Sequence, residues 1–314
     1  MRQVVQNDKK SPERAPSHRT RIRGGLAVLA VAALASGCAQ PEAQVRPAPG
    51  QQHPQGPPAP AAAPGSFADR LHTSYVQRAA TAKRWSLERV PLIPPQPPTA
   101  KPRATARAGF EVKHQKDWNL PPVFTTVPTK DKVVFLTIDD GAEKDPEFLR
   151  MMRDLKIPYT AFLTDDLIKG DYGYFWKMQG SGVTLNNHTL HHRYLPALSY
   201  EEQKREICGM QDIMEERFGK RPKMFRPPYG NYNQDTLRAA RSCGIEYAPI
   251  WNEEVYVDHW EFREDDQRLR PGDIVLTHFR GRSEWNGTMA DDMRRFLNKV
   301  TADGYAVARL EDYL

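Results

Sequence analysis

The sequence predicts an α/β domain over residues 112–314, with the fold of a distorted, incomplete (β/α) barrel of about seven parallel strands. Short apolar pieces alternate with longer helix-like segments, an order that favours a parallel sheet covered by helices. This domain of about 200 residues is shorter than a complete eight-fold barrel, which needs roughly 250. No G-x-G-x-x-G motif opens the first helix, which argues against a dinucleotide-binding sheet.

The expected elements follow from the hydrophobic pattern and from helix-end signals. Strands are expected at 133–138, 159–163, 183–185, 224–226, 247–250, 274–277 and 306–308. Helices are expected at 146–155, 172–179, 200–218, 234–243 and 289–302. Ser199 and Glu202 predict a capping box at the start of the third helix. Gly219, Gly244 and Gly304 stand where helices usually end in glycine.

The first third of the chain does not resemble a folded domain. Residues 1–37 combine a basic segment, an apolar run at 26–35 and the small residues Ser36 and Gly37, which predicts a signal peptide. The apolar run is shorter than the roughly 20 residues that a membrane span needs. Cys38 directly after it resembles the lipidation site of a bacterial lipoprotein, and plain secretion is the alternative. Residues 38–111 predict a largely disordered, Pro/Ala-rich linker with one modest helix near 66–85.

The charge of the chain does not predict a nucleic-acid partner. The segment before Cys38 has seven Lys/Arg and two Asp/Glu, so it carries most of the formal charge of +6. The remaining chain is therefore nearly neutral and has no basic stripe with interleaved aromatic residues. Outside the membrane, Cys208 and Cys243 are free to form a disulfide, and two buried thiols are the alternative.

Two adjacent carboxylates, Asp139 and Asp140, stand where the first buried strand should end. Residues 133–138 are apolar except for Thr137, so the charges are costly to bury without a metal ion, a positive partner or catalytic use. Gly141 allows the chain to turn away at this point. An ordinary Asp-Gly turn is the plain alternative.

The segment N-N-H-T-L-H-H at residues 186–192 follows the third expected strand. His188 and His192 are four residues apart, a spacing that places both imidazoles on one side of a helical turn. With one carboxylate they make the two-His, one-acid set of a catalytic metal site. The spacing alone leaves His188 with His191 open as the pair.

Two further motifs, F-R-P-P-Y-G at 225–230 and I-V-L-T-H-F at 274–279, also coincide with strand ends. Prolines fix the backbone between Arg226 and Tyr229, and a rigid arginine can orient a carboxylate through paired hydrogen bonds. His278 ends an apolar strand, and its pKa range suits a general acid. Because function concentrates at the carboxyl edge of parallel sheets, we expect these groups to converge with Asp139.

Together the motifs T-I-D-D-G, H-T-L-H-H, R-P-P-Y-G and L-T-H resemble those of the polysaccharide deacetylase family, carbohydrate esterase family four. The resemblance covers roughly residues 132–314 and leaves out the leader and the linker. It implies a distorted (β/α) barrel and metal-dependent removal of acetyl groups from N-acetylated sugars.

The resemblance also implies a role for each matched position. Asp139 is the expected catalytic base, Arg226 the residue that orients it, and His278 the catalytic acid. Tyr229 is expected to supply a backbone N–H to the oxyanion, and Leu276 to line the acetyl pocket.

The metal ligands implied by the resemblance are Asp140, His188 and His192, which selects His192 over His191. Zn²⁺ is the usual ion of the family, and an Asp-His-His set also accepts Co²⁺, Ni²⁺ or Mn²⁺.

The chain departs from the family pattern in the fourth motif, where an Asp tunes the acid histidine and a Trp walls the pocket. Residues 251–260 read W-N-E-E-V-Y-V-D-H-W and contain no Asp-Trp dipeptide. We expect Asp258 to tune His278 and Trp260 to form the wall. The alternatives are Glu253 or Glu254 for the acid and Trp251 for the wall.

The expected function is hydrolysis of N-acetyl groups on cell-wall glycan, most simply N-acetylglucosamine of peptidoglycan. The expected partners are this polysaccharide and, through the lipid on Cys38, the extracellular face of a bacterial cytoplasmic membrane. Chitin oligomers, N-acetylmuramic acid and acetylated xylan are alternative substrates. A wall-binding lipoprotein without turnover is the alternative from another class of protein.

Overall fold

The computed structural model describes residues 65–314, of which residues 70–314 fall in one compact unit. The expected signal peptide at 1–37, Cys38 and the first part of the expected linker lie outside the described residues. Between residues 65 and 314, no helix has both the length and the apolar character to cross a membrane.

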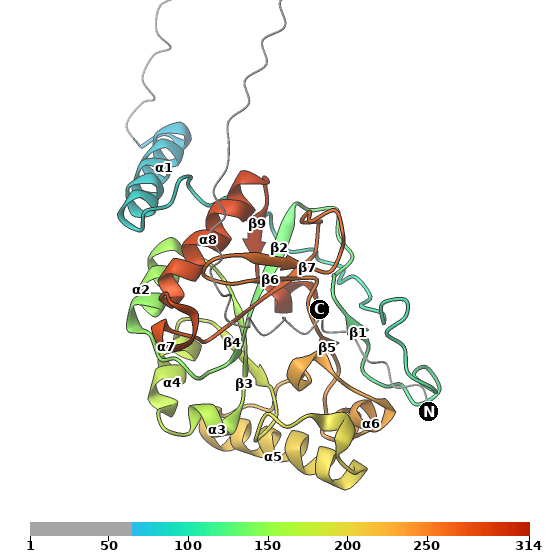
Figure 1. Cartoon of the computed structure of the whole chain (residues 1–314). Helices are drawn as coiled ribbons and strands as arrows, with labels where there is room; N and C mark the ends of the chain where they lie inside the picture. The colour runs from blue at the N-terminus through green and yellow to red at the C-terminus, as the bar shows by residue number, and fades with distance from the viewer. Residues whose placement is uncertain (1–64) are drawn as a thin grey trace, which may run out of the picture. The chain divides into compact units, whose positions relative to one another are not determined.

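A seven-stranded sheet forms the centre of the fold (Figure 1). Its strands are β2 (Val133–Asp140), β3 (Thr160–Leu163), β4 (Thr184–Asn187), β6 (Glu253–Val255), β7 (Trp260–Phe262), β8 (Ile274–His278) and β9 (Ala306–Ala308). They pair in the order β4-β3-β2-β8-β6-β7, and β9 also pairs with β2. Only β6 and β7 pair in the antiparallel direction. The α/β class is therefore as expected, and closure into a barrel stays a prediction.

Two expected strands take a different form. Residues 224–226 make only isolated bridges, from Met224 to Tyr247 and from Phe225 to Asn187. The prolines that follow cannot donate to a ladder, which stops the pairing there. Strand β5 (Ala248–Pro249) pairs with β1 (Val123–Phe124) in a separate two-stranded sheet. The sequence did not predict β1, β6 or β7, which have two or three residues each.

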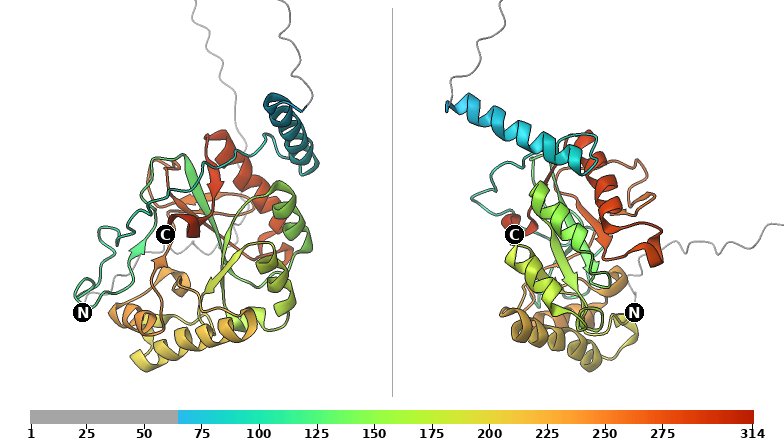
Figure 2. Two further views of the ribbon diagram at one scale, coloured as in Figure 1. Left: turned by 180° about the vertical axis from the view of Figure 1, so that it is seen from behind. Right: turned by 90° about the vertical axis from the view of Figure 1, so that its left-hand side faces the viewer.

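Helices α2, α4, α5, α6 and α8 lie around the strands, as the turned views also show (Figure 2). The bounds of the helices are α1 (Phe67–Arg84), α2 (Pro146–Leu155), α3 (Asp165–Ile168), α4 (Tyr172–Gly180), α5 (Tyr200–Phe218), α6 (Gln234–Ser242), α7 (Arg282–Trp285) and α8 (Met289–Ala302). Ser199 and Glu202 form the expected capping box of α5, and Gly219 ends that helix in the left-handed conformation.

The main hydrophobic core lies on one face of β2. Val134, Leu136 and Ile138 pack there with side chains of α2, α4, α5 and α8. The alternate residues Val133 and Phe135 join a second cluster. Because side chains alternate along a strand, Asp139 shares the face of Phe135 rather than that of the main core.

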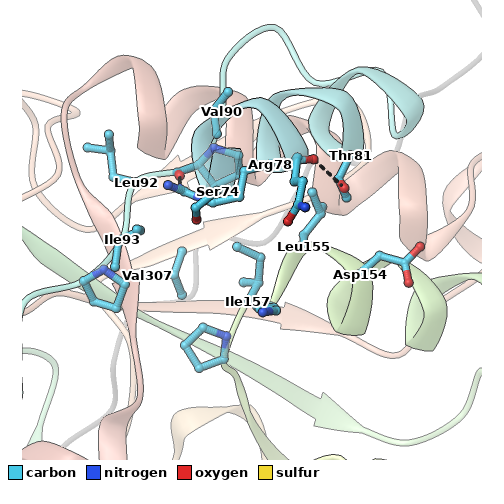
Figure 3. A pocket seen from close by; sticks show the side chains of 15 residues that line it. Ser74, Arg78, Thr81, Val90, Leu92, Ile93, Asp154, Leu155, Ile157 and Val307 are labelled. Atoms are coloured by element: carbon cyan, nitrogen blue, oxygen red, sulfur yellow. Dashed lines mark hydrogen bonds between the residues drawn. The ribbon is translucent and has the colours of Figure 1, made fainter. Parts of the chain in front are cut away.

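Part of the expected linker packs on the domain. Trp85 and Leu87 contact the main core, and Arg84 is 3.3 Å from Asp154 of α2. A cavity of about 380 Å³ lies among α1, residues 90–94 and the end of α2 (Figure 3). Its wall includes Ile157, which precedes β3, so this cavity is at the edge of the sheet opposite to the strand ends that carry the motifs.

A disulfide joins Cys208 of α5 to Cys243 at the end of α6, one of the two outcomes that the sequence left open. It lies in a small apolar cluster that also includes Phe225. The two cysteines are separated by 35 positions in the sequence. In the chain-entropy account, closing this loop raises the free energy of the unfolded chain by about 4 kcal/mol, which stabilises the folded state. The closed loop contains Arg226 and Tyr229.

Candidate active site

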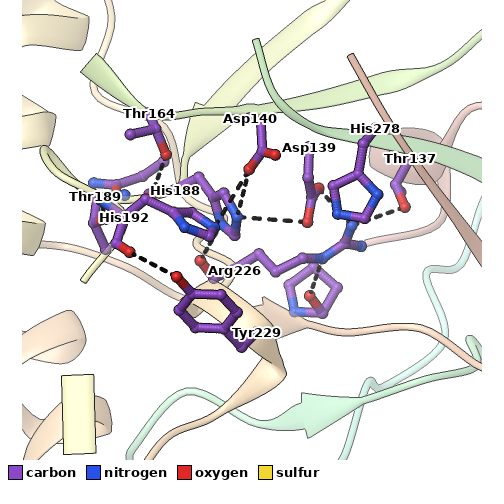
Figure 4. Close-up of polar contacts among 12 residues, drawn as sticks. Thr137, Asp139, Asp140, Thr164, His188, Thr189, His192, Arg226, Tyr229 and His278 are labelled. Atoms are coloured by element: carbon purple, nitrogen blue, oxygen red, sulfur yellow. Dashed lines mark hydrogen bonds and ion pairs between the residues drawn. The ribbon is translucent and has the colours of Figure 1, made fainter. Parts of the chain in front are cut away.

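The motif side chains meet beyond the carboxyl ends of β2, β4 and β8 (Figure 4). Asp139 lies with His188 and His192 on one side and His278 on the other. Asp139 and His278 are register partners on the adjacent strands β2 and β8. The sheet therefore gathers groups that are far apart in the sequence.

Arg226 holds Asp139 in a fixed position. Its Nη1 donates to Oδ1 of Asp139 at 2.7 Å and to Oγ1 of Thr137 at 2.9 Å. Its Nε donates to the carbonyl oxygen of Pro249, and the arginine is fully buried. Burial raises the pKa of Asp139 to about 6, although the Arg226 charge opposes this shift. The carboxylate is thus deprotonated at neutral pH and more basic than an exposed aspartate.

Asp140 and the two imidazoles form a set of converging donor atoms. Oδ1 of Asp140 is 3.6 Å from Nε2 of His188 and 3.3 Å from Nε2 of His192. Ligands bound at about 2.0–2.1 Å with tetrahedral angles lie roughly 3.4 Å apart, which matches these distances. Oδ1 of Asp140 is also buried without a hydrogen-bond partner. This donor set fits a divalent metal ion.

Hydrogen bonds set the direction of both imidazoles. Nδ1 of His188 donates to the carbonyl oxygen of Arg226 at 2.7 Å, which leaves the Nε2 lone pair facing Asp140. The backbone N–H of His192 donates to Oγ1 of Thr189 at 3.0 Å. Burial lowers the pKa of His188 and of His192 to about 4. Both rings are therefore neutral near pH 7, as metal ligands must be.

Left-handed backbone at non-glycine residues marks the site. Asp140 has φ 80°, Thr189 φ 75°, His192 φ 52° and Tyr229 φ 60°. Such conformations cost energy for residues with a Cβ and are concentrated at functional sites. The turn at Asp140 breaks the side-chain alternation of β2, which allows consecutive carboxylates to reach neighbouring partners.

Of the three histidines in the motif, His191 points elsewhere. Its Nδ1 is 2.9 Å from Oε1 of Glu206, and its side chain is half exposed. The geometry therefore brings together His188 and His192, the pair that the resemblance implied. The three-residue set of Asp140, His188 and His192 has ligand atoms within 4.8 Å of one another.

Arg280 is a site residue that sequence reasoning missed. Its Nη2 is 2.5 Å from Oδ2 of Asp140, and its Nη1 is 2.9 Å from Glu284. Burial would raise the pKa of Asp140, but the histidines of the site, His278 first, and then Arg280 lower it. An arginine two residues after His278 is indistinguishable from a surface arginine in the sequence. Only the folded loop reveals this contact.

The fourth-motif prediction is wrong for the acid. Asp258 has a side chain that is 84% exposed and pairs with its neighbour His259. Oε1 of Glu254 instead lies 3.2 Å from Nδ1 of His278. Burial would lower the pKa of His278, but Glu254 and then the two aspartates raise it to about 9. Residues 256–259 connect the antiparallel strands β6 and β7, which carries Asp258 away from the site.

The assignment of Trp260 to the wall of the pocket stays a prediction. Trp260 stacks on Phe262 and Phe296, with ring centres 5.8 and 6.1 Å away, against the main core. Trp251 lies over the Arg226 guanidinium at 5.7 Å. The aromatic ring in contact with the acid histidine is Trp285 of α7, whose centre is 5.9 Å from that of His278. Nothing in the linear motif distinguishes Trp285 from other tryptophans.

The two remaining residues lie at the rim and the base of the site. Leu276 is buried in β8, two residues before His278 and hence on the same face of the strand. The ring of Tyr229 is 51% exposed and packs edge-on against His192, with ring centres 4.7 Å apart.

Comparison with known proteins identifies the family. The family model described as polysaccharide deacetylase matches residues 126–248. An uncharacterised Streptomyces coelicolor protein, SCO4760, is 42% identical over 196 residues, which cover 62% of this chain and 78% of that protein. The chain therefore belongs to the polysaccharide deacetylase family, carbohydrate esterase family four, whose members are metal-dependent.

More distant relatives include proteins named for an activity. A peptidoglycan-N-acetylglucosamine deacetylase of Bacillus cereus is 24% identical over 197 residues, which cover 60% of this chain and 91% of that protein. The solved structure of the Bc1960 peptidoglycan N-acetylglucosamine deacetylase aligns with a TM-score of 0.54 and 20% identity, over 64% of this chain and 97% of that one. A family pseudoenzyme from Bacillus anthracis, BA3943, aligns at 0.52 and 19%, over 62% and 69%. At these identities the two structures show the shared fold.

Proposed function

We propose that this protein is a metal-dependent deacetylase that removes the acetyl group from N-acetylglucosamine in peptidoglycan and releases acetate. The observation that carries the proposal is the buried Asp139–Arg226 pair beside the converging Asp140, His188 and His192. The activity of the Bacillus cereus relative supports the choice of substrate.

Asp140, His188 and His192 would hold the metal, with Zn²⁺ the first choice and Co²⁺, Ni²⁺ or Mn²⁺ as alternatives. When bound, such an ion polarises the amide carbonyl and makes a water molecule more acidic. The neutral imidazoles and the unpartnered Oδ1 of Asp140 support this assignment.

Asp139 acts as the general base. Its carboxylate accepts a proton from the water whose oxygen attacks the acetyl carbon. Arg226 keeps Oδ1 of this carboxylate occupied, so Oδ2 remains for the water. The pKa of about 6 makes Asp139 deprotonated at neutral pH yet basic enough to take the proton.

His278 acts as the general acid. With a pKa near 9 it carries a proton at neutral pH, and it gives this proton to the sugar nitrogen as the C–N bond breaks. The products are acetate and a free amine on the sugar. The Tyr229 backbone N–H would stabilise the oxyanion by a few kcal/mol, and Leu276 would contact the acetyl methyl group.

The location and the partners belong to the same proposal. A lipid on Cys38 and the Pro/Ala-rich linker would hold the domain on the extracellular face of the membrane, next to peptidoglycan. A wall-binding protein without turnover is not favoured, because the base, the acid and the full ligand set are all present.

Acetate release from purified peptidoglycan, with and without a chelator, tests the proposal. We expect release that stops with the chelator and returns with added zinc. Chitin oligomers, N-acetylmuramic acid and acetylated xylan serve as competing substrates. If none of these substrates releases acetate, the enzymatic function is contradicted. If one of the competing substrates releases acetate faster than peptidoglycan does, it replaces peptidoglycan as the proposed substrate.

A further inference from the structure

The aliphatic side chains that the fold leaves exposed are concentrated in one short part of the chain. In the described residues, the exposed Leu, Ile and Val side chains are Leu71, Val76, Leu92 and Ile93, and Ile93 has 69% of its surface exposed. Tyr75 adds an exposed aromatic ring to the same part of the chain. Such a concentration of apolar surface usually marks a contact with a partner or a membrane. The proposed reaction uses none of these side chains.

The exposed side chains of α1 continue a face of the helix that is covered further along. Ala82 is buried, and Tyr75 and Leu71 precede it by seven and eleven residues, which places all three on one side of the helix. The exposed fractions of Tyr75 and Leu71 are 57% and 56%. The apolar face of α1 is therefore covered near its C-terminal end and uncovered toward its N-terminal end.

Residues 90–94 are fixed beside this helix. Nη2 of Arg78 donates to the carbonyl oxygen of Pro91, and Leu92 forms an isolated bridge with Ala306, the first residue of β9. The cavity of about 380 Å³ lies between α1 and these residues, and its wall includes both Leu92 and Ile93 (Figure 3). The helix and the extended segment therefore border the same opening, and the exposed apolar side chains come from both.

The charge of this part of the chain differs from that of the rest. Residues 66–111 contain eight Lys/Arg and three Asp/Glu, whereas residues 112–314 contain 29 Lys/Arg and 33 Asp/Glu. Lys83 and Arg89 are among the exposed cations. Cationic side chains next to exposed apolar ones are typical of helices that lie in the headgroup region of membranes with anionic lipids. The excess of positive charge favours such a membrane over a second copy of this chain, which would bring like charges together.

We propose that α1 and residues 90–93 bind the surface of a bilayer that contains anionic phospholipid, with Leu71, Tyr75 and Ile93 in its headgroup region. Phe67, the first residue of α1, follows the proposed lipid site Cys38 by 29 positions, so a lipid there would bring this surface to the membrane. The cavity is at the sheet edge opposite to the catalytic side chains. The bound domain would thus turn its active site away from the bilayer. This contact extends the proposed location and does not depend on the deacetylase activity.

Hydrogen exchange of the full chain, with and without vesicles, tests the contact. Cys38→Ser removes the proposed lipid site, and the vesicles contain phosphatidylcholine alone or with about 30% phosphatidylglycerol. With the anionic vesicles, we expect the amides of residues 71–93 to exchange at least about fivefold more slowly, because the headgroup region excludes water. The amides of α4 should not change. Because the measurement is local, attachment to the vesicles through residues 1–37 does not imitate this result.

Substitutions at exposed positions separate the apolar part of the contact from the ionic part. In Leu71→Gln combined with Ile93→Gln, the lipid concentration for half-maximal protection should rise at least about tenfold, because burial of even one such side chain is worth that much. Trp176→Gln, at an exposed position of α4, is the matched control and should keep the wild-type value. Lys83→Gln combined with Arg89→Gln should weaken binding to the anionic vesicles by about fivefold per charge.

Unchanged exchange of residues 71–93 on anionic vesicles would overturn the inference, and so would equal protection in the wild type and in the Leu71→Gln, Ile93→Gln variant. Equal protection by both kinds of vesicle would overturn the choice of anionic lipid. Light scattering without vesicles addresses the other occupant: a dimer that forms in the wild type but not in this variant would assign the surface to self-association. If the wild type releases no acetate, the proposed function fails, while the exchange result still decides the membrane contact.

Discussion

Arg280 donates from Nη2 to Oδ2 of Asp140 at 2.5 Å, while Oδ1 of the same carboxylate faces the imidazoles of His188 and His192. One oxygen is thus held by the guanidinium and the other is left for a metal ion. Arg280 is itself held by Glu284 on α7. Partners of this kind fix the orientation of a ligand and tune its affinity for metal.

Arg280→Met should therefore weaken zinc binding. The loss of a partner of a metal ligand typically costs about 10–100-fold in affinity. Competition with a chromogenic chelator measures the dissociation constant directly. Arg282→Met, two residues further along the chain at the start of α7 and with an exposed side chain, is the control and should keep the wild-type affinity. Tighter zinc binding by Arg280→Met would mean that the guanidinium mainly repels the ion.

Glu254→Gln should shift the alkaline limb of the pH profile to lower pH. The Glu254 carboxylate makes the largest contribution among the groups that raise the pKa of His278 to about 9, so its removal favours the neutral imidazole. As the acid must be protonated, kcat/KM should begin to fall at a lower pH, by about one unit or more. Asp258→Asn is the matched control, because that side chain is exposed and away from His278. A shift in the control but not in Glu254→Gln would restore the original fourth-motif prediction.

Asp139→Asn should abolish turnover, which means a fall in kcat of at least about 10²-fold, and should leave the zinc affinity nearly unchanged. In the wild type, kcat/KM should fall as the pH drops through the pKa of this base, which burial raises to about 6. A bound divalent cation favours the carboxylate, so the acid limb should lie at or below that value. Asp140→Asn should instead reduce both turnover and zinc binding. Wild-type turnover in the Asp139→Asn variant would show that Asp139 is not the general base.

Glu253→Gln should change the pH dependence of stability. Glu253 is 1% exposed, and burial, with Asp273 nearby, raises its pKa to about 10. The folded chain then keeps a proton that the unfolded chain releases above pH 4.5, so this group reduces stability as the pH rises from 4.5 toward 10. Urea unfolding at several pH values should show that the free energy of unfolding of the wild type falls relative to that of the variant over this range. Glu216→Gln, exposed on α5, should parallel the wild type, and a parallel Glu253→Gln curve would contradict the shift.

Long and strongly patterned elements could be predicted from the sequence. Strand β2 is a continuous apolar run, and α5 has its capping box and its C-terminal glycine, so each carries its own signal. The short strands β6 and β7 carry no such signal, because three residues cannot define a period. Their antiparallel pairing decides which acid faces His278, and for this reason the acid of the fourth motif was assigned wrongly.

The residues of the site also divide into those with a local sequence signal and those without one. The local spacing indicated a histidine pair but left His191 open beside His192, and only the folded chain shows the ring of His191 turned toward Glu206. The contact between Arg280 and Asp140 joins residues that are 140 positions apart, so no local pattern reports it. Likewise, Trp285 reaches His278 only because α7 folds back over the end of β8.

The bond between Cys208 and Cys243 closes a covalent ring around the segment that presents Arg226 to the base. Reducing conditions, such as those inside a bacterial cell, keep this ring open. A newly made chain would thus have a looser arginine segment until it meets an oxidant. With the export proposed above, oxidation would follow the passage out of the cell, and the proposed deacetylase chemistry would be held back until then.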